Sequence, residues 1–518
     1  MKKMKKNLIK IFDRIKYILE FIFSLFFIIS IYKIITIKNY EGYWSRKILV
    51  YLLLFGIITI IIIVYNCIKD RNKIEKMFLN FAIPVGLSYI IFMLPTYTPD
   101  AGAHLWKAYE VSEGTLFTEI DENGKSYTAV PEVLSTYRET TLTKYNILNE
   151  LFSKSEAFDY NKTTNVDTPA KIYNFIYYIG YAIGLAISRI LSLNLFIGVL
   201  FARIINFIIF LSIAYISIKI IPFGKILLAT YLMIPMMFQQ ATAISADSIM
   251  NIMIILFISY TLYLAFKKER LKNKEQVIIL ILSIFVGISK LTYIPVLGIG
   301  LILIKHRKEW SLRRKILIGL LAIIVCFGSA FISNRISSRY SNTIAIENYL
   351  KENGVNNSEQ IKGIINNPVH FIKVLFWNNL NVNGEYYLYG CIGQHMGWLT
   401  ILFPTIYIFL YILLLFAAVF VENNEEVLNL PEKIWMTSLG IIMALLVVTG
   451  LYIEHSRVGS DIVAGVQGRY FLPIIVLPLL CICKKNNFIK IKQPNILIPL
   501  WAFVINLLFI GKIITFFI

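Results

Sequence analysis

The chain has 518 residues, of which 57% are hydrophobic and 16% are charged, and its formal net charge is +20. Apolar runs of about 18 to 24 residues recur from end to end, long enough to cross a hydrocarbon core about 30 Å thick. Runs of this length fit helices and not the shorter strands of a membrane barrel. The composition therefore excludes a soluble globular protein and predicts an all-α integral membrane protein.

The basic residues form short clusters between the apolar runs. This pattern is typical of the cytoplasmic side of a membrane protein, where lysine and arginine face anionic lipid. It predicts a multi-pass protein of the cell membrane with a cytoplasmic N-terminus, in contact with membrane lipid and without nucleic acid as a partner. The clusters cover residues 2–10, 69–76, 267–274, 305–315 and 484–492.

The clusters also fix the order of the spans. Two spans, at about 15–38 and 47–68, predict an additional N-terminal hairpin over residues 1–76, and a membrane domain over 77–518 follows it. Outer loops are expected at about 96–194, 334–397 and 454–468. About 13 spans are predicted in all, the further ones at about 77–95, 195–219, 223–241, 246–266, 276–288, 291–304, 315–333, 398–421, 434–453, 469–483 and 493–516.

The apolar segment 172–193 admits two interpretations. Counting spans back from the basic cluster at 267–274 places residue 194 outside, so a crossing at 172–193 would move the preceding polar loop inside. The segment begins with tyrosines and phenylalanines, which are common at the membrane–water interface. We therefore expect a helix on the outer interface, and a true span with a miscounted neighbour is the alternative.

Asp100 and His104 lie where the third span meets the first outer loop. Pro99 favours a helix start, and the helix would end near Gly114. A spacing of four places Asp100 and His104 on one helix face, near Lys107. Asp100 is a candidate general base toward an acceptor hydroxyl, and the alternative is that its side chain only caps the helix.

Three charged residues fall within or beside predicted spans, near their outer ends. They are Arg203, Asp247 and Lys290. Charge at membrane depth is costly and marks a candidate functional site. For each residue, an interfacial anchor or a structural ion pair is the alternative.

The short outer loop near residue 460 supplies two more candidates, Arg457 and Arg469. Arg469 opens a helix, where the helix dipole disfavours a cation, so an anion facing it is the natural explanation. A phosphate would match the forked guanidinium group, and a snorkelling interface arginine is the alternative. The five cysteines have no metal-ligand spacing, and no phosphate-binding or dinucleotide motif occurs. We therefore predict no cofactor and leave a divalent metal open.

Several motifs resemble, in chain order, a bacterial membrane family known as domain of unknown function 2142. The resemblance covers roughly residues 77–485, and its last motif is the most specific. The motifs are Pro99–Asp100 with His104, Tyr109 and Ser112–Gly114, then Ala202–Asn206, Ile221–Lys225, Ser245–Ser248, Ser289–Lys290, Gly397–Leu399 and Gly465–Pro473.

That family is similar to the GT-C superfamily of membrane glycosyltransferases. Those enzymes move a sugar from a polyprenyl-phosphate carrier to an acceptor on the outer face, and their catalytic carboxylate follows a span, as Asp100 does. The family often has an acidic residue directly after the aspartate, and here it is Ala101. This difference removes the basis for a second carboxylate role, such as metal binding, at this position.

The resemblance implies an inverting glycosyltransferase that uses an undecaprenyl-phosphate-type sugar donor and a cell-envelope glycan or teichoic-acid-like acceptor. Asp100 would be the base and His104 its orienting neighbour. The donor phosphate would contact cations, and Asp247 would contact the sugar or pair with one of them; the candidate cations are Arg203, Lys290, Arg457 and Arg469. The alternatives are a flippase for lipid-linked sugars and a polysaccharide polymerase or ligase.

Overall fold

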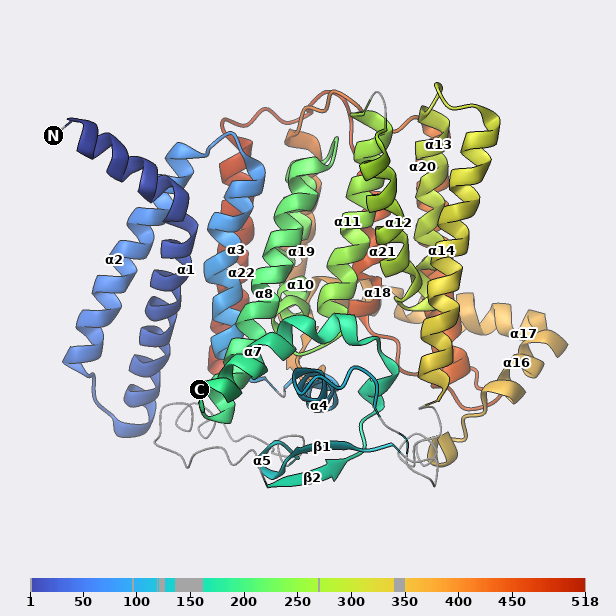
Figure 1. Cartoon of the computed structure of the whole chain (residues 1–518), viewed down its shortest axis with the longest axis horizontal. Coiled ribbons are helices and arrows are strands. Elements are labelled where there is room, and N and C mark those ends of the chain that lie inside the picture. Colours follow the sequence, from blue (N-terminus) through green and yellow to red (C-terminus); the bar gives the residue numbers. More distant parts are fainter. Residues whose placement is uncertain are drawn as a thin grey trace.

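The structure is a computed structural model, and it describes residues 2–95, 97–118, 120, 126–135, 162–268, 271–339 and 350–517. Most of its helices run side by side in one bundle (Figure 1). Among the described residues, eight helices are long and apolar enough to cross a membrane. They are α1 (Lys2–Glu41), α2 (Arg46–Lys69), α3 (Ile74–Phe92), α8 (Leu195–Ile220), α11 (Asp247–Phe266), α14 (Leu312–Ser338), α20 (Leu430–Glu454) and α22 (Pro494–Phe517).

The other predicted spans fall on shorter or interrupted helices. Proline contributes to the interruptions, because it lacks the N–H that continues a helix: Pro235 opens α10, and Pro295 lies within η4. The all-α membrane fold is thus confirmed. These elements are α9 (Lys225–Tyr231), α10 (Pro235–Thr242), α12 (Asn273–Gly287), η4 (Leu291–Ile299), α13 (Gly300–His306), α19 (Thr405–Val421), η6 (Gly468–Phe471) and α21 (Leu472–Ile482).

A layer of short elements lies across one end of the bundle (Figure 1). It comes from the first predicted outer loop, and its two strands pair antiparallel with Thr128 opposite Val166. Residues 96, 119, 121–125 and 136–161 of that loop lie outside the described residues. The layer contains α4 (Ala101–Ser112), β1 (Thr128–Pro131), α5 (Glu132–Ser135), β2 (Thr163–Val166), η2 (Pro169–Ile172), η3 (Phe175–Tyr178) and α7 (Ile179–Ile190).

Helix α7 covers most of segment 172–193, for which the sequence allowed either an interfacial helix or a true span. It has 12 residues and runs across the end of the bundle rather than along it (Figure 1). Ile179, Ile183 and Ile187 form an exposed apolar stripe on it, as an interfacial helix requires. The prediction that the tyrosines lie in a belt at the membrane–water interface is wrong for Tyr177, Tyr178 and Tyr181, which are buried in the protein.

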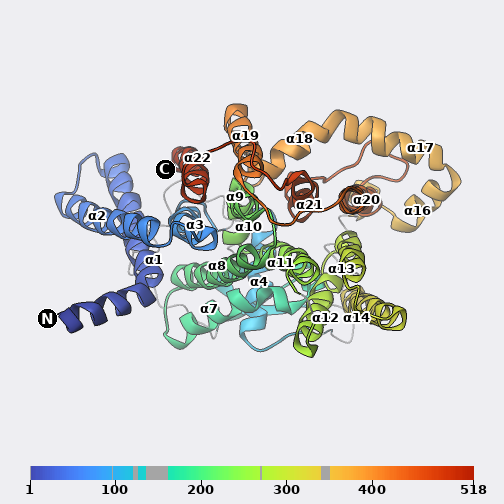
Figure 2. The ribbon, with the colours of Figure 1, turned by 90° about the horizontal axis from the view of Figure 1, so that it is seen from above.

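The second large outer segment is also helical. Helices α16, α17 and α18 curve around the side of the bundle between α19 and α20 (Figure 2). A short strand pair, His395 opposite Leu402, then leads into α19. Residues 340–349 of this predicted loop lie outside the described residues. The elements are α16 (Asn357–Asn366), α17 (Pro368–Ile372), η5 (Lys373–Leu380), α18 (Asn381–Ile392), β3 (His395–Met396) and β4 (Ile401–Leu402).

Helices α3 and α11 form the centre of the bundle and are buried on nearly all sides. The N-terminal hairpin of α1 and α2 packs against α3 (Figure 1). The separate unit proposed for residues 1–76 stays a prediction. What matters for the site is that α3 ends, and α11 and η6 begin, at the end of the bundle that the layer covers.

Candidate functional site

Asp100 occupies a strained turn between α3 and α4. Its backbone is left-handed, with φ of 62° and ψ of 9°, a conformation that costs a non-glycine residue about 1–2 kcal/mol. Its side chain makes no capping bond to α4, so the capping alternative is wrong. The carboxylate is instead 59% exposed and lies 3.8 Å from the Arg469 guanidinium. Strain of this kind is frequent at functional sites.

Arg469 approaches Asp100 from the other side of the site, on η6. Gly468 lets η6 pack directly on α18, because a Cβ there would lie 2.2 Å from the backbone of Gly390. The guanidinium donates to the Tyr470 hydroxyl at 3.3 Å. Arg469 is only 8% exposed, and its Nε has no hydrogen-bond partner within the described part of the chain. A buried cation with an unused donor is well suited to an anionic ligand.

A second ion pair joins the start of α11 to the junction of α12 and η4. The Lys290 ammonium donates to Asp247 at 2.8 Å, and both side chains are largely buried. The same ammonium lies 4.7 Å from the centre of the Tyr470 ring, and the Tyr293 hydroxyl donates to the Tyr470 backbone carbonyl at 2.8 Å. Tyr470 therefore links the pair Asp247–Lys290 to Arg469 and Asp100.

His104 lies behind these charges in an aromatic setting. Its Nδ1 and the Tyr178 hydroxyl are 2.6 Å apart, and its ring packs on Tyr173. Burial lowers the pKa of His104 to about 4, and Asp100 and Asp247 oppose this shift. Neutral His104 can therefore accept or donate one hydrogen bond, but it adds no positive charge at neutral pH.

A cavity of about 320 Å³ adjoins the Lys290 side of the site. Lys290 and Tyr470 form part of its wall, and helices α12, α14 and α20 frame it. Apolar side chains such as Met250 and Val447 lie beside polar ones. This mixed lining suits an amphiphile with a charged headgroup. Further polar lining residues are Tyr173, Asn174, Ser289, Thr292, Ser333, Asn334, Ser337, Glu454 and His455.

Arg203 is placed differently from the other candidate cations. It is 2% exposed, and its guanidinium donates to backbone carbonyls. These acceptors end α3 and α10, where helix dipoles favour a cation, so the geometry favours a structural role. The bonds run to Thr242 at 2.6 Å, Ile90 at 2.7 Å, Met93 at 3.1 Å and Tyr89 at 3.3 Å.

Two other basic residues also lie apart from Asp100. Arg457 is exposed and packs over Gly354 in the loop after α20, and it is not among the described residues that line the cavity. Lys107 is buried and paired with Glu110 at 2.7 Å. The structure thus gathers Asp100, His104, Asp247, Lys290 and Arg469, and places Arg203 and Arg457 elsewhere.

Sequence reasoning gave Tyr470 and the tyrosines around His104 no role in the site. The sequence did contain a signal for Tyr470, because this residue follows Arg469 within Gly465–Pro473, the most specific motif of the family resemblance. Tyr178 had none, because its sequence neighbourhood resembles an interfacial belt. Among the described residues, no group of three or more His, Cys, Asp or Glu side chains could hold a metal ion.

The fold and the site together define a multi-pass α-helical membrane protein with charged residues and a cavity at one end of its bundle. The family of predicted membrane proteins DUF2142 matches residues 84–478, and the chain belongs to this family. The resemblance seen in the sequence is thereby confirmed for the family. No curated protein and no solved structure matches the chain.

Proposed function

We propose that the protein is an inverting membrane glycosyltransferase of the GT-C type. It would move a sugar from a polyprenyl-phosphate carrier to a hydroxyl of a cell-envelope polymer on the outer face. One observation carries the proposal: the exposed Asp100 carboxylate lies beside Arg469, which shares Tyr470 with Lys290 at the wall of a cavity between membrane helices.

The charges suit the two ends of a glycosyl transfer. Asp100 takes the proton of the acceptor hydroxyl as its oxygen forms a bond to the anomeric carbon. The bond from that carbon to the phosphate oxygen breaks, and the polyprenyl phosphate leaves with the electron pair. Arg469 and Lys290 stabilise the negative charge on the leaving phosphate. Attack from the opposite side of the sugar inverts the anomeric centre.

The cavity fits the donor better than a free nucleotide sugar. Its frame of α12, α14 and α20 lies among membrane helices, and α14 exposes most of its apolar side chains. A lipid chain can remain in the bilayer while its phosphate enters beside Lys290. Seryl and asparaginyl side chains of α14 are then available to the sugar hydroxyls.

The distribution of basic residues supports an outer-facing site. The described basic residues of the clusters at 69–76, 267–268, 271–274, 305–315 and 484–492 lie at or beside connections at the end of the bundle opposite α4 (Figure 1). Cytoplasmic loops carry most of the lysine and arginine. By this rule, the end with Asp100 and Lys290 faces away from the cytoplasm.

The test uses purified protein in liposomes with radiolabelled undecaprenyl-phosphate sugars and a cell-wall polymer fraction. Wild type is expected to move label from lipid to polymer, and Asp100→Asn is expected to lose this activity while remaining folded in the membrane. Asp461→Asn, an exposed carboxylate in another loop, is the matched control and should keep activity. Near-normal transfer by Asp100→Asn would remove Asp100 from the mechanism.

A flippase for lipid-linked sugars is the second candidate, and the interrupted helix α9–α10 favours it. Transporters use broken helices to build substrate sites within the membrane, and here α9 ends at Tyr231 and α10 begins at Pro235. The same liposomes distinguish the two functions. Labelled lipid that crosses the bilayer without any transfer to polymer would replace the glycosyltransferase by the flippase.

A further inference from the structure

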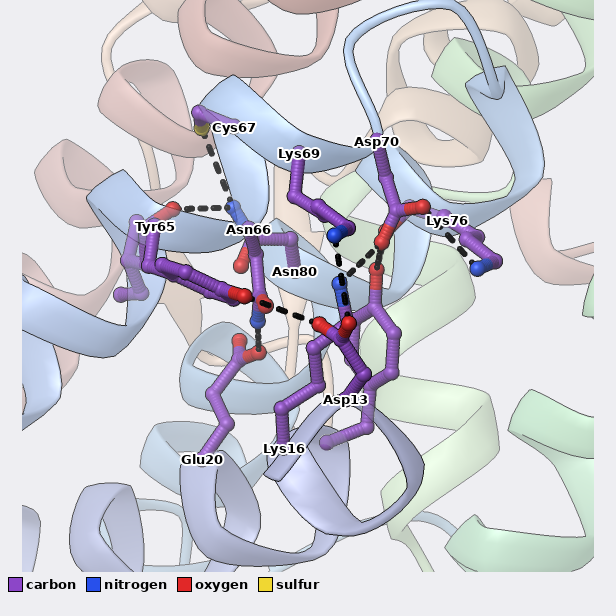
Figure 3. Close-up of polar contacts among 12 residues, drawn as sticks. Asp13, Lys16, Glu20, Tyr65, Asn66, Cys67, Lys69, Asp70, Lys76 and Asn80 are labelled. Carbon is purple, nitrogen blue, oxygen red and sulfur yellow. Dashed lines mark hydrogen bonds and ion pairs between the residues drawn. The ribbon is translucent and has the colours of Figure 1, made fainter. Parts of the chain in front are cut away.

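The N-terminal hairpin meets α3 through a set of polar side chains, about half of them buried, shown in Figure 3. The part nearest the basic clusters is well paired. Asp70 binds Lys16 and, at 3.0 Å, Lys76, while Asp13 binds Lys69 at 3.2 Å and the Tyr65 hydroxyl at 2.9 Å. Two aspartates thus pair with three lysines, and each of these charged side chains has a partner.

The next helical turn of α1, toward the middle of the membrane, is different. Around it, the oxygen atoms that accept hydrogen bonds outnumber the groups that donate them. Glu20 is fully buried, and its Oε2 accepts from the Asn66 amide at 2.7 Å. Its Oε1 has no hydrogen-bond partner in the described ranges of the chain. The buried amide oxygens of Asn66 and Asn80 likewise have no hydrogen-bond partner within those ranges.

Both asparagines have already used their amide nitrogens. Asn66 donates to Glu20, and Asn80 donates to the Ile63 carbonyl at 3.3 Å and to the Cys67 sulfur at 3.2 Å. These bonds place Asn80 beside the turn of α2 that carries Asn66, and Figure 3 shows both side chains between Cys67 and Glu20. One turn along α1, the buried Ser24 hydroxyl also lacks a partner among described residues.

Unpaired acceptors in a membrane interior cost several kilocalories per mole each, and clustered oxygens also repel one another. A cation among them removes both costs. Oxygen atoms are the ligands of hard cations. A single carboxylate balances one positive charge, and Lys16, one helical turn from Glu20, disfavours a divalent ion.

We propose that Glu20, Asn66 and Asn80 bind one monovalent alkali cation between α1, α2 and α3. Ser24 is a further oxygen within reach along the α1 face. The site lies outside the part of the chain that the family matches, and it is independent of the proposed transferase site. The bound ion would fasten the hairpin to α3.

The experiment measures equilibrium binding of ²²Na⁺ to the full-length protein in detergent, at constant ionic strength set with choline chloride. Wild type is expected to bind about one Na⁺ per chain saturably, with unlabelled Na⁺ or K⁺ competing. Glu20→Gln keeps the shape of the side chain and is expected to weaken binding at least tenfold. Glu41→Gln, an exposed glutamate at the far end of the same helix, is the matched control and should bind as wild type.

Asn80→Ala provides a second variant in case Glu20→Gln fails to fold, and it should also weaken Na⁺ binding. Thermal unfolding with and without Na⁺ gives an independent readout: the midpoint of wild type should rise with Na⁺, and that of Glu20→Gln should not. Absence of saturable ²²Na⁺ binding by wild type would overturn the proposal. Equal binding by wild type, Glu20→Gln and Asn80→Ala would overturn the assignment of these residues.

Discussion

The Asp100 carboxylate and the Arg469 guanidinium approach to 3.8 Å although they belong to opposite ends of the sequence. Asp100 is exposed and Arg469 is buried, so water or substrate reaches the carboxylate more easily than the guanidinium. A looser contact of this kind leaves the carboxylate free to accept a proton and the guanidinium free to bind an anion. The pair is therefore arranged for two different ligands rather than only for each other.

Replacing Arg469 tests the anion side of the site. Arg469→Gln removes the charge that would stabilise a leaving phosphate, and loss of one such group lowers turnover about 100-fold to 1,000-fold. We expect a drop of that size in the liposome transfer assay. Arg457→Gln alters another arginine of the same loop region, placed against Gly354, and should lower transfer less than threefold. An equal loss in both variants would contradict the placement of the phosphate at Arg469.

The pair of Asp247 and Lys290 allows a structural role to be separated from a role toward substrate. Lys290→Met leaves Asp247 buried without its partner, which should destabilise the protein by about 3 kcal/mol. Adding Asp247→Asn should restore most of that stability, because it removes the buried carboxylate charge that the first substitution left without its partner. Thermal unfolding in detergent measures both effects.

Transfer activity of the same double variant decides the function of Lys290. If the ammonium contacts the donor phosphate, activity stays low although stability returns. Recovery of activity together with stability would show that the pair only supports the fold.

His104 predicts a specific pH dependence of stability. Its pKa is about 4 when folded and about 6.5 when unfolded. The unfolded chain therefore binds this proton first, and the stabilising contribution is complete above pH 6.5 and lost as the pH falls toward 4. The loss amounts to about 3 kcal/mol at pH 4.

The measurement compares unfolding midpoints of wild type and His104→Gln between pH 7 and pH 4. Glutamine can still bond to the Tyr178 hydroxyl but does not titrate, so the variant should lose less stability on acidification. Carboxylates that do not interact with His104 titrate equally in both proteins and cancel in the difference. Parallel pH curves for the two proteins would contradict a buried, neutral His104.

The order of helices followed from the sequence because apolar length and basic clusters are local properties. Each predicted span coincides with a helix or an interrupted helix. Helix α7 lies across the end of the bundle, as expected from counting the spans back from the basic cluster at 267–274. The roles of individual charged residues depended instead on their partners in the folded protein. The depth of Arg203 and Lys290 in the membrane predicted the same kind of role for both. The structure separates them, because Arg203 bonds to backbone carbonyls whereas Lys290 reaches a cavity.

The contacts of buried tyrosines were also beyond sequence reasoning. Tyr178 bonds to His104 across a long segment of chain, and nothing in its neighbourhood distinguishes it from Tyr173, which lines the cavity. The unpaired oxygens near Glu20 were equally hidden. Whether Asn66 and Asn80 turn their amide nitrogens toward partners depends on the packing of three helices.

Close packing of α7 on α8 provides a test of the layer that carries the site. A Cβ on Gly184 would lie 2.4 Å from the backbone of Ala202, so Gly184→Ala must force the two helices apart. Overpacking of this kind costs about 1–3 kcal/mol, and we expect a lower unfolding midpoint. Because α7 also packs on α4, the shift should displace His104 and reduce transfer activity as well.

Gly363→Ala is the matched control for this prediction. Gly363 lies in the exposed helix α16, and a Cβ there meets no atom within 4 Å. Alanine is the better helix former, so the variant should gain up to about 1 kcal/mol of stability and keep its activity. Unchanged stability and transfer in Gly184→Ala would mean that α7 is not fixed against α8, and that the candidate site does not depend on that contact.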